Sequence, residues 1–129
     1  MTRSVLLSIK PQYAYDILNG DKLFEYRRAP PAISPPYKNY LYASNPVQKV
    51  VGEAVTREEV RDNVENIIKI TCDRTTSTPD EIRGYFHGVR EACALKMEDT
   101  YKYALPKELK ITPPQNFMYV EKKPWKINP

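Results

Sequence analysis

A short polar cluster near the N-terminus holds the most concentrated chemistry in the sequence. A glycine turn at Gly20 precedes Lys22, and Glu25 and Arg27 follow two residues apart. Residues two apart in a strand lie on the same face, about 7 Å apart along the chain, so Glu25 and Arg27 are expected side by side and able to form an ion pair. A guanidinium fork, an ammonium and a carboxylate in one cleft could hold a phosphate or the edge of a base.

The alternative interpretation of this cluster is a half-exposed strand with a surface ion pair worth about 0–1 kcal/mol. Ser8 and Lys10, at alternate positions leaving a first strand, would point at the same cleft if the two strands pair. Ser44, in a turn, and Asn116, before a closing strand, are expected at the rim of that cleft.

Tyrosines are interleaved with basic residues in the first third of the chain. Tyr13 and Tyr26 lie close in sequence to Lys10, Arg27 and Arg28. Stacking on a base needs an aromatic face beside a cation, so this mixture favours nucleic acid as a partner. We expect one or two tyrosines to touch a ligand and the rest to pack.

Other familiar sites are missing from the sequence. It contains no glycine-rich phosphate loop and no Gly-x-Ser-x-Gly nucleophile elbow. Cys72 and Cys93 are far apart and His87 is the only histidine, which argues against a disulfide framework and a zinc site and indicates a reducing compartment. We therefore expect no metal and no cofactor.

The order of prolines and apolar residues predicts the elements that position the cluster. Pro11 begins a helix that ends at Asn19-Gly20, and Thr78 caps another helix, later in the chain, that ends at Gly88. Gly52 predicts a bend or a close backbone approach. The expected strands are 5–9, 22–28, 40–43, 49–61, 92–97, 101–103 and 117–120; a helix is expected over 63–72, a stiff proline-rich loop over 29–36, and a tail without clear periodicity over 121–129.

This order predicts an α+β fold, a small mixed β-barrel with an N-terminal helix and a helical insertion. The length of 129 residues predicts one domain spanning 1–129. Twenty basic against sixteen acidic residues suit a polyanionic partner only mildly. Because no apolar run is long enough for a signal-peptide core or a membrane span, we expect a cytoplasmic protein without membrane contact.

The spacing of Gly20, Lys22, Glu25 and Arg27 resembles Gly-x-Lys-x-x-Glu-x-Arg, the hallmark of the ASCH domain, a branch of the PUA-like β-barrels. Further similar segments run through the chain to about Val120: Ser8-Ile9-Lys10-Pro11, Val50-Val51-Gly52-Glu53, Tyr85-Phe86-x-Gly88, Ala92-x-Ala94-Leu95 and Pro113-Pro114-Gln115-Asn116-Phe117. The resemblance implies a PUA-like fold.

The resemblance also implies a choice of functions. The family is linked to RNA binding, and some small members are hydrolases. Those similar to N4-acetylcytidine amidohydrolases use a lysine, a glutamate and a threonine three residues after the lysine; here that position is Glu25.

Three hypotheses follow. The first is an RNA-binding module that recognises RNA or a modified nucleoside, with Glu25 as acceptor, Arg27 as the positioning fork and Lys22 as the phosphate or carbonyl partner. The second is a small hydrolase, an amidohydrolase or a ribonuclease, with Lys22 and Glu25 as catalytic residues. The third is an interaction domain that engages a protein partner through the proline-rich loop or the basic tail.

Overall fold

The computed structural model describes residues 3–126, which form eight strands and three helices. The strands are β1 (Ser4–Ile9), β2 (Phe24–Arg27), β3 (Tyr37–Ala43), β4 (Lys49–Thr56), β5 (Glu59–Asp62), β6 (Ala92–Lys96), β7 (Glu98–Lys107) and β8 (Phe117–Val120), and the helices are α1 (Pro11–Leu18), α2 (Val64–Thr71) and α3 (Pro79–Tyr85). None of these helices is long and apolar enough to cross a membrane.

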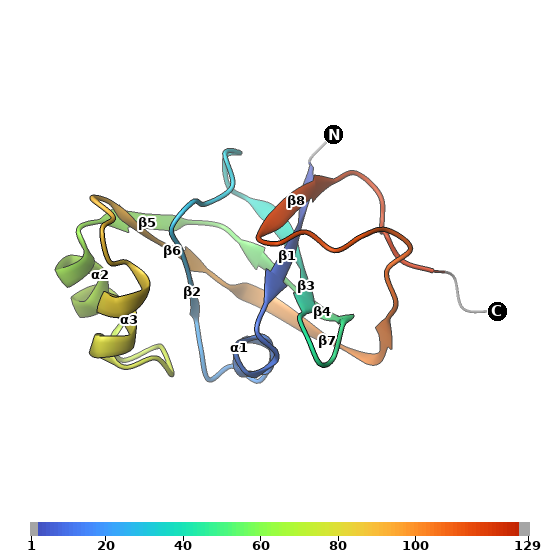
Figure 1. Cartoon of the computed structure of the whole chain (residues 1–129), viewed down its shortest axis with the longest axis horizontal. Helices are drawn as coiled ribbons and strands as arrows, with labels where there is room; N and C mark the ends of the chain where they lie inside the picture. Colours follow the sequence, from blue (N-terminus) through green and yellow to red (C-terminus); the bar gives the residue numbers. More distant parts are fainter. Residues whose placement is uncertain (1–2, 127–129) are drawn as a thin grey trace.

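The strands form two sheets. The five-stranded sheet has the order β7-β4-β3-β1-β8, in which β1 and β3 are parallel and the other pairs antiparallel. The second sheet, β2-β6-β5, is antiparallel. Figure 1 shows α2 and α3 together at the end of the smaller sheet, and α1 between β2 and the larger sheet.

This architecture confirms the predicted α+β fold with an N-terminal helix and a helical insertion. The chain passes between the sheets four times, from β1 to β2, from β2 to β3, from β4 to β5 and from β6 to β7. The main apolar core lies against α1 and the inner face of the larger sheet. Strand pairing among the described residues leaves two separate sheets rather than one closed ring.

The predicted strand over residues 49–61 is wrong in one respect, because it is two strands in different sheets. β4 ends at Thr56, whose side chain is buried and accepts a hydrogen bond from Asn39 Nδ2 at 2.9 Å. Arg57 and Glu58 are exposed, and Glu59 then pairs with Leu95 of β6. The chain therefore leaves one sheet and joins the other within two residues.

Two weakly predicted segments are also more regular than expected. The short strand expected near Tyr101 is the ten-residue β7, whose exposed residues obscure the usual alternation. In the tail, Lys110 N donates to Pro124 O at 3.1 Å and Lys126 N donates to Glu108 O at 2.8 Å. The remainder of the predicted tail, residues 127–129, lies outside the described residues.

The predicted start of α3 and the predicted glycine stop after α1 are both confirmed. Thr78 and Glu81 form a reciprocal capping box at the start of α3, and Gly20 adopts a left-handed conformation (φ +85°) after α1. Helix α3 ends at Tyr85 rather than Gly88, which follows in a turn with φ +81°.

Gly52 is confirmed as a point of close approach. A Cβ atom at this position would lie 2.6 Å from Tyr101 O and 2.7 Å from Leu18 Cδ2. The register of β4 against both neighbours shifts near this residue, so the sheet bends around it.

We expect Gly52→Ala to lower the free energy of unfolding by about 1–3 kcal/mol, because the added methyl group overlaps a backbone oxygen that cannot move freely. Urea denaturation measures the change. Gly84→Ala is the matched control, because nothing lies within 4 Å of its Cβ position in α3, and it should be neutral or stabilising by about 0.5–1 kcal/mol. Equal effects of the two substitutions would contradict the role given to Gly52.

Candidate functional site

The polar cluster of β2 faces a cavity of about 470 Å³. In Figure 1, β2 runs between α3 on one side and α1 with β1 on the other, and these elements supply the walls. The lining side chains from the N-terminal third include Ser8, Lys10, Tyr13, Lys22, Glu25, Tyr26 and Arg27. Segments that are distant in sequence therefore meet at the predicted cluster.

Lys22 is delivered to the cavity by the turn that ends α1. Gly20 N donates to Ile17 O, and Lys22 N donates to Asp16 O at 3.1 Å, which fixes the backbone just before β2. The side chain then runs inward, and the residue is only 2% exposed.

The Lys22 ammonium has polar and aromatic partners but no ion pair among the described residues. Its Nζ donates to Thr75 Oγ1 at 3.3 Å and to Ser77 Oγ at 3.4 Å. It also lies 4.5 Å from the ring centroid of Tyr26 and 5.0 Å from that of Tyr13, both cation–π contacts. Burial lowers the pKa of Lys22 from its usual 10.5, although the charges of Glu25, Asp16 and Glu81 act in the opposite direction.

Glu25 and Arg27 form the ion pair that their spacing allows. Arg27 Nη2 lies 2.9 Å from Glu25 Oε2, and each side chain is only 9% exposed. Arg27 Nη2 also donates to the backbone oxygen of Ser8 at 2.7 Å. The pair is therefore buried, which contradicts the alternative of a surface ion pair on a half-exposed strand.

Arg27 keeps unused donors. Its Nε is buried without a hydrogen-bond partner, and its Nη1 takes part in none of the hydrogen bonds among residues 3–126. A buried guanidinium normally has its donors satisfied, so Arg27, which lines the cavity, keeps donors that the fold does not use.

The buried charges of the cavity do not balance within the cluster. Lys22 and Arg27 are both buried cations, whereas Glu25 is the one buried carboxylate of the cluster and is already paired with Arg27. A buried cation without a counter-ion is unfavourable in a low dielectric, and an incoming anion would offset that cost. The buried cluster therefore carries one positive charge in excess, while the exposed residues Lys10 and Glu81 add one charge of each sign to the lining.

The remaining predicted site residues divide into two groups. Ser8, Lys10, Tyr13 and Asn116 line the cavity together with the cluster. Pairing of β1 with β2 was the expected reason for this proximity, but the two strands belong to different sheets. These residues line the cavity nonetheless. Ser8 Oγ donates to Pro114 O at 2.6 Å and Ser8 N donates to Asn116 O at 2.9 Å, which holds the segment before β8 at the rim.

Arg28 and Ser44 do not line the cavity, contrary to expectation. Arg28 follows Arg27 directly and its Nη1 donates to the backbone oxygens of Tyr85 and His87, at 2.8 and 2.9 Å. Ser44 closes the turn between β3 and β4, where its N donates to Ile9 O and its backbone oxygen accepts from Val47 N.

One wall of the cavity could not be predicted from the sequence. The helical insertion contributes Ser77, Glu81, Ile82, Gly84 and Tyr85. The capping box at the start of α3 orients Glu81, and hydrogen bonds from Thr78 lower the pKa of its carboxyl group. The similarity of Tyr85-Phe86-x-Gly88 to the family pattern was a signal for this wall, but nothing local showed which way the helix faces.

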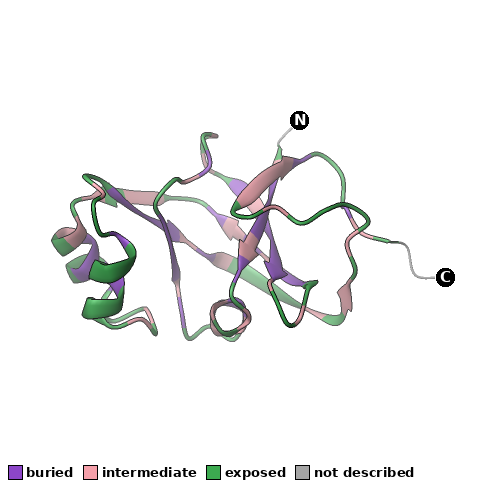
Figure 2. Ribbon diagram, in the orientation of Figure 1, coloured by how far each residue is buried: buried purple, intermediate pink, exposed green. Residues whose placement is uncertain are grey.

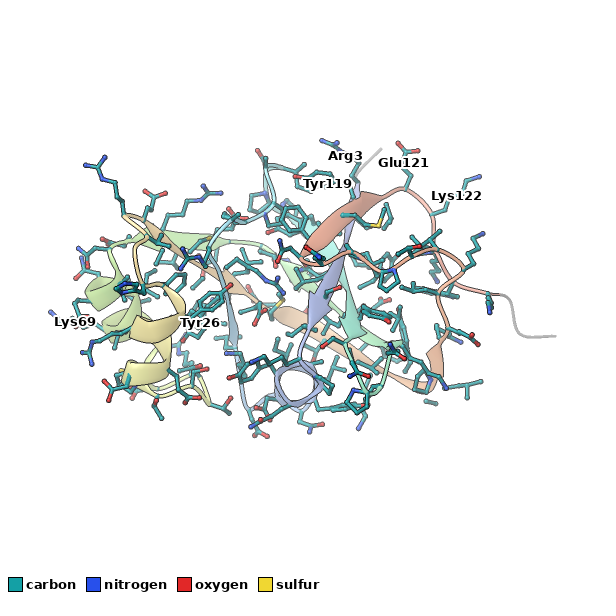
Figure 3. All side chains as sticks on the ribbon, in the orientation of Figure 1. Arg3, Tyr26, Lys69, Tyr119, Glu121 and Lys122 are labelled. Carbon is teal, nitrogen blue, oxygen red and sulfur yellow. The ribbon has the colours of Figure 1, made fainter. Side chains whose placement is uncertain are left out.

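Figure 3 shows Tyr26 between β2 and α3, where its ring meets Phe86 edge-on with 6.0 Å between centroids. Its hydroxyl group bonds to Thr71 Oγ1 at 2.8 Å. Tyr26 therefore packs the insertion against β2. Among the described residues, no group of three or more histidine, cysteine, aspartate or glutamate side chains comes together as a metal site would require.

Comparison with known proteins relates the chain to a family and to a bacterial protein of related sequence. The sequence model of a family described as a domain of unknown function, DUF365, matches residues 2–122. An ASCH domain-containing ribonuclease from Zymomonas mobilis subsp. mobilis is 27% identical over 97 residues, which make up 75% of this chain and 66% of that protein. The match thus spans just under two thirds of the relative's length.

Solved structures of ASCH from Zymomonas mobilis share the fold. One crystal structure has a TM-score of 0.85 at 25% sequence identity and covers 92% of this chain and 88% of that chain. The crystal structure of a ZmASCH mutant protein has a TM-score of 0.85 at 24% identity, with 92% and 91% covered.

Proposed function

Because the chain belongs to the DUF365 family and has the fold of an ASCH domain, we propose that it is one RNA-binding domain whose cavity holds a phosphate and its nucleoside. The observation that carries the proposal is the charge of the buried cluster: Lys22 and Arg27 are buried cations, and the one buried carboxylate, Glu25, is already paired. At the exposed part of the lining, Lys10 and Glu81 offset each other. A phosphodiester supplies the missing negative charge and acceptors for the free donors of Arg27.

The nucleoside has two aromatic candidates for stacking. Tyr13 lies on α1 at the cavity wall, and Tyr85 on α3 is 43% exposed. A base needs one accessible ring face, and these two rings offer it from separate walls. Glu25 is the acceptor for an amino or ribose hydroxyl donor.

The polyanion is favoured over a free small anion by the surroundings of the cavity. Lys10 is exposed at the rim, where it attracts phosphates beyond the one that is bound. The relative from Zymomonas mobilis is named a ribonuclease, and this name supports RNA as the polymer.

The first experiment measures fluorescence anisotropy of a labelled single-stranded RNA of about 12 nucleotides, a length within the range that single-strand binders cover. We expect binding that weakens about ten-fold or more between low and physiological salt, because bound phosphates release counter-ions. DNA of the same sequence is the control for the ribose hydroxyl group. Absence of RNA binding at low salt would refute the proposal.

A second candidate function, RNA cleavage, is favoured by the name of the relative and by the position of Lys22 near Glu25. The ribose 2′-oxygen would attack phosphorus while Glu25 accepts its proton, and the bond from phosphorus to the 5′-oxygen would break as Lys22 donates a proton to that oxygen. The products would be a 2′,3′-cyclic phosphate and a 5′-hydroxyl end. The lowered pKa of Lys22 makes its ammonium a better acid for this step.

Chromatography of the same incubations separates the two functions. Cyclic phosphate ends formed by the wild-type protein and not by Lys22→Met would assign an enzyme, whereas intact RNA in both would assign a binding domain. N4-acetylcytidine belongs in the same incubations, because the amidohydrolase hypothesis predicts its conversion to cytidine.

A further inference from the structure

The outer face of the five-stranded sheet carries a row of four aromatic rings that lies apart from the cavity. Tyr101 and Tyr103 of β7 have ring centroids 5.8 Å apart, Tyr103 and Trp125 5.7 Å, and Trp125 and Tyr40 of β3 5.2 Å. None of these four residues lines the cavity. We call them the aromatic row.

Three of the four rings have a lysine beside them. Lys107 Nζ lies 6.0 Å from the centroid of Tyr103, and Lys123 Nζ lies 5.7 Å from that of Trp125. Lys38 Nζ lies 6.0 Å from the centroid of Tyr40. Lys38 is also paired with Glu53 at 3.1 Å, and Tyr40 is buried in the core cluster against which Tyr103 and Trp125 pack. The accessible part of the row is therefore Tyr101 with the half-buried rings of Tyr103 and Trp125, beside Lys107 and Lys123.

The net positive charge of the chain gathers in the segment that builds this face. Residues 102–126 contain six lysines against two glutamates, a net charge of +4, which equals the formal net charge of the whole protein. One glutamate, Glu108, is paired with Lys126 at 3.0 Å. The rest of the chain is electrically balanced. Glu53, which accepts from the Tyr103 hydroxyl at 2.7 Å, is neutralised by Lys38 at 3.1 Å, so the excess of lysines in this segment can attract a polyanion.

The β7 end of the aromatic row is exposed to solvent. Tyr101 is 61% exposed and Leu105, further along the same strand, is 60% exposed. Figure 2 shows β7 largely in the colour of exposed residues. Large apolar side chains gathered on an exposed edge strand are typical of an interaction surface.

We propose that this face is a second contact for single-stranded RNA, in which bases stack on Tyr101 and the accessible faces of Tyr103 and Trp125, and Lys107 and Lys123 bind the adjoining phosphates. The choice of RNA rests on the function proposed for the cavity. Proteins that bind single-stranded nucleic acids commonly stack the bases on aromatic side chains and bind the phosphates with nearby cations. A second copy of this chain would bring an equally positive face, and an acidic peptide would leave the rings without a stacking partner.

Trp125 makes the test specific, because it is the only tryptophan in the sequence. We expect an RNA of about 12 nucleotides to quench the tryptophan fluorescence, since a stacked base contacts the aromatic row directly. Uridine monophosphate, which can enter the cavity, should not quench it. Polyglutamate is the control for charge without bases.

Two substitutions change the aromatic row and a lysine beside it, at positions that do not line the cavity. Tyr101→Ala deletes the exposed ring, and Lys123→Gln removes one ammonium. Together they should weaken binding of the 12-nucleotide RNA at least about five-fold, as expected for one lost stacked base. Lys69→Gln is the matched control, because Lys69 is exposed and lies at the opposite end of the molecule from Lys122 in Figure 3.

The outcomes distinguish this surface from the cavity. Quenching that persists in Lys22→Met, where the cavity has lost its cation, would support the second contact. RNA binding with unchanged tryptophan fluorescence, and unchanged affinity of the double variant, would overturn it and leave the cavity proposal standing. Equal quenching by polyglutamate would also overturn it, because stacking would not be involved.

Discussion

Lys22→Met should weaken RNA binding and leave the protein at least as stable as the wild type. Lys22 is buried without an ion pair, so methionine, of similar length, removes a desolvated charge and keeps the packing. We expect affinity for single-stranded RNA to fall about ten-fold or more, as for a lost charged partner, and the free energy of unfolding to stay constant or rise by about 1 kcal/mol. Anisotropy and urea denaturation measure the two quantities.

The pH dependence of stability and of RNA affinity tests whether the buried charge of Lys22 causes both effects. Burial lowers the pKa of Lys22, so between that value and 10.5 the unfolded chain binds more protons than the folded one. Stability of the wild type should therefore rise with pH through this window, while RNA affinity falls as the ammonium loses its charge. Lys22→Met should lack the stability rise.

Lys10→Met makes the same change of charge at the exposed rim, where it should weaken RNA binding modestly and leave stability unchanged. A variant Lys22→Met that is strongly destabilised, or that binds RNA as the wild type does, would show that Lys22 has a structural role instead.

Arg27→Met should cause the largest loss of stability of any substitution at the site. It removes the partner of Glu25 at 2.9 Å and leaves a buried carboxylate uncompensated. Breaking a buried pair by removing one partner costs about 3–5 kcal/mol. The variant should also lose RNA binding, because the guanidinium supplies the free donors of the cavity. Urea denaturation at neutral pH measures the first effect.

The double variant Glu25→Gln with Arg27→Met separates the buried charge from the packing. It should recover most of the stability, because the unpaired carboxylate that Arg27→Met leaves is gone, but it should not recover RNA binding. Arg83→Met is the matched control: Arg83 pairs with Glu65 at 2.9 Å on the exposed surface, and its loss should change stability little. Similar losses for Arg27 and Arg83 would mean that burial of the Arg27 pair has no energetic weight.

The local parts of the fold were predictable from the sequence. Capping by Thr78, the glycine stop at Gly20 and the crowding at Gly52 depend on backbone geometry within a few residues or on the absence of a Cβ atom. The split of the strand over 49–61 was not predictable, because polar residues such as Arg57 are compatible with both a strand and a crossing between sheets.

The candidate site, too, was only partly predictable from the sequence. The two-residue spacing of a strand placed Glu25 and Arg27 side by side, and the structure confirms their ion pair. The same alternation gave no reason to exclude Arg28, whose guanidinium is held instead by backbone oxygens at the end of α3.

The sequence by itself therefore determined the chemical groups of the cluster and their order along β2, because strand periodicity acts over neighbouring residues. Only the tertiary structure decided that the ion pair is buried, that Lys22 has no counter-ion among the described residues, and that α3 closes the cavity. Burial depends on which distant segments pack over a residue. Ser77, which meets Lys22 from 55 residues away, leaves no periodic signal in the sequence, since its contact arises from sheet and helix packing.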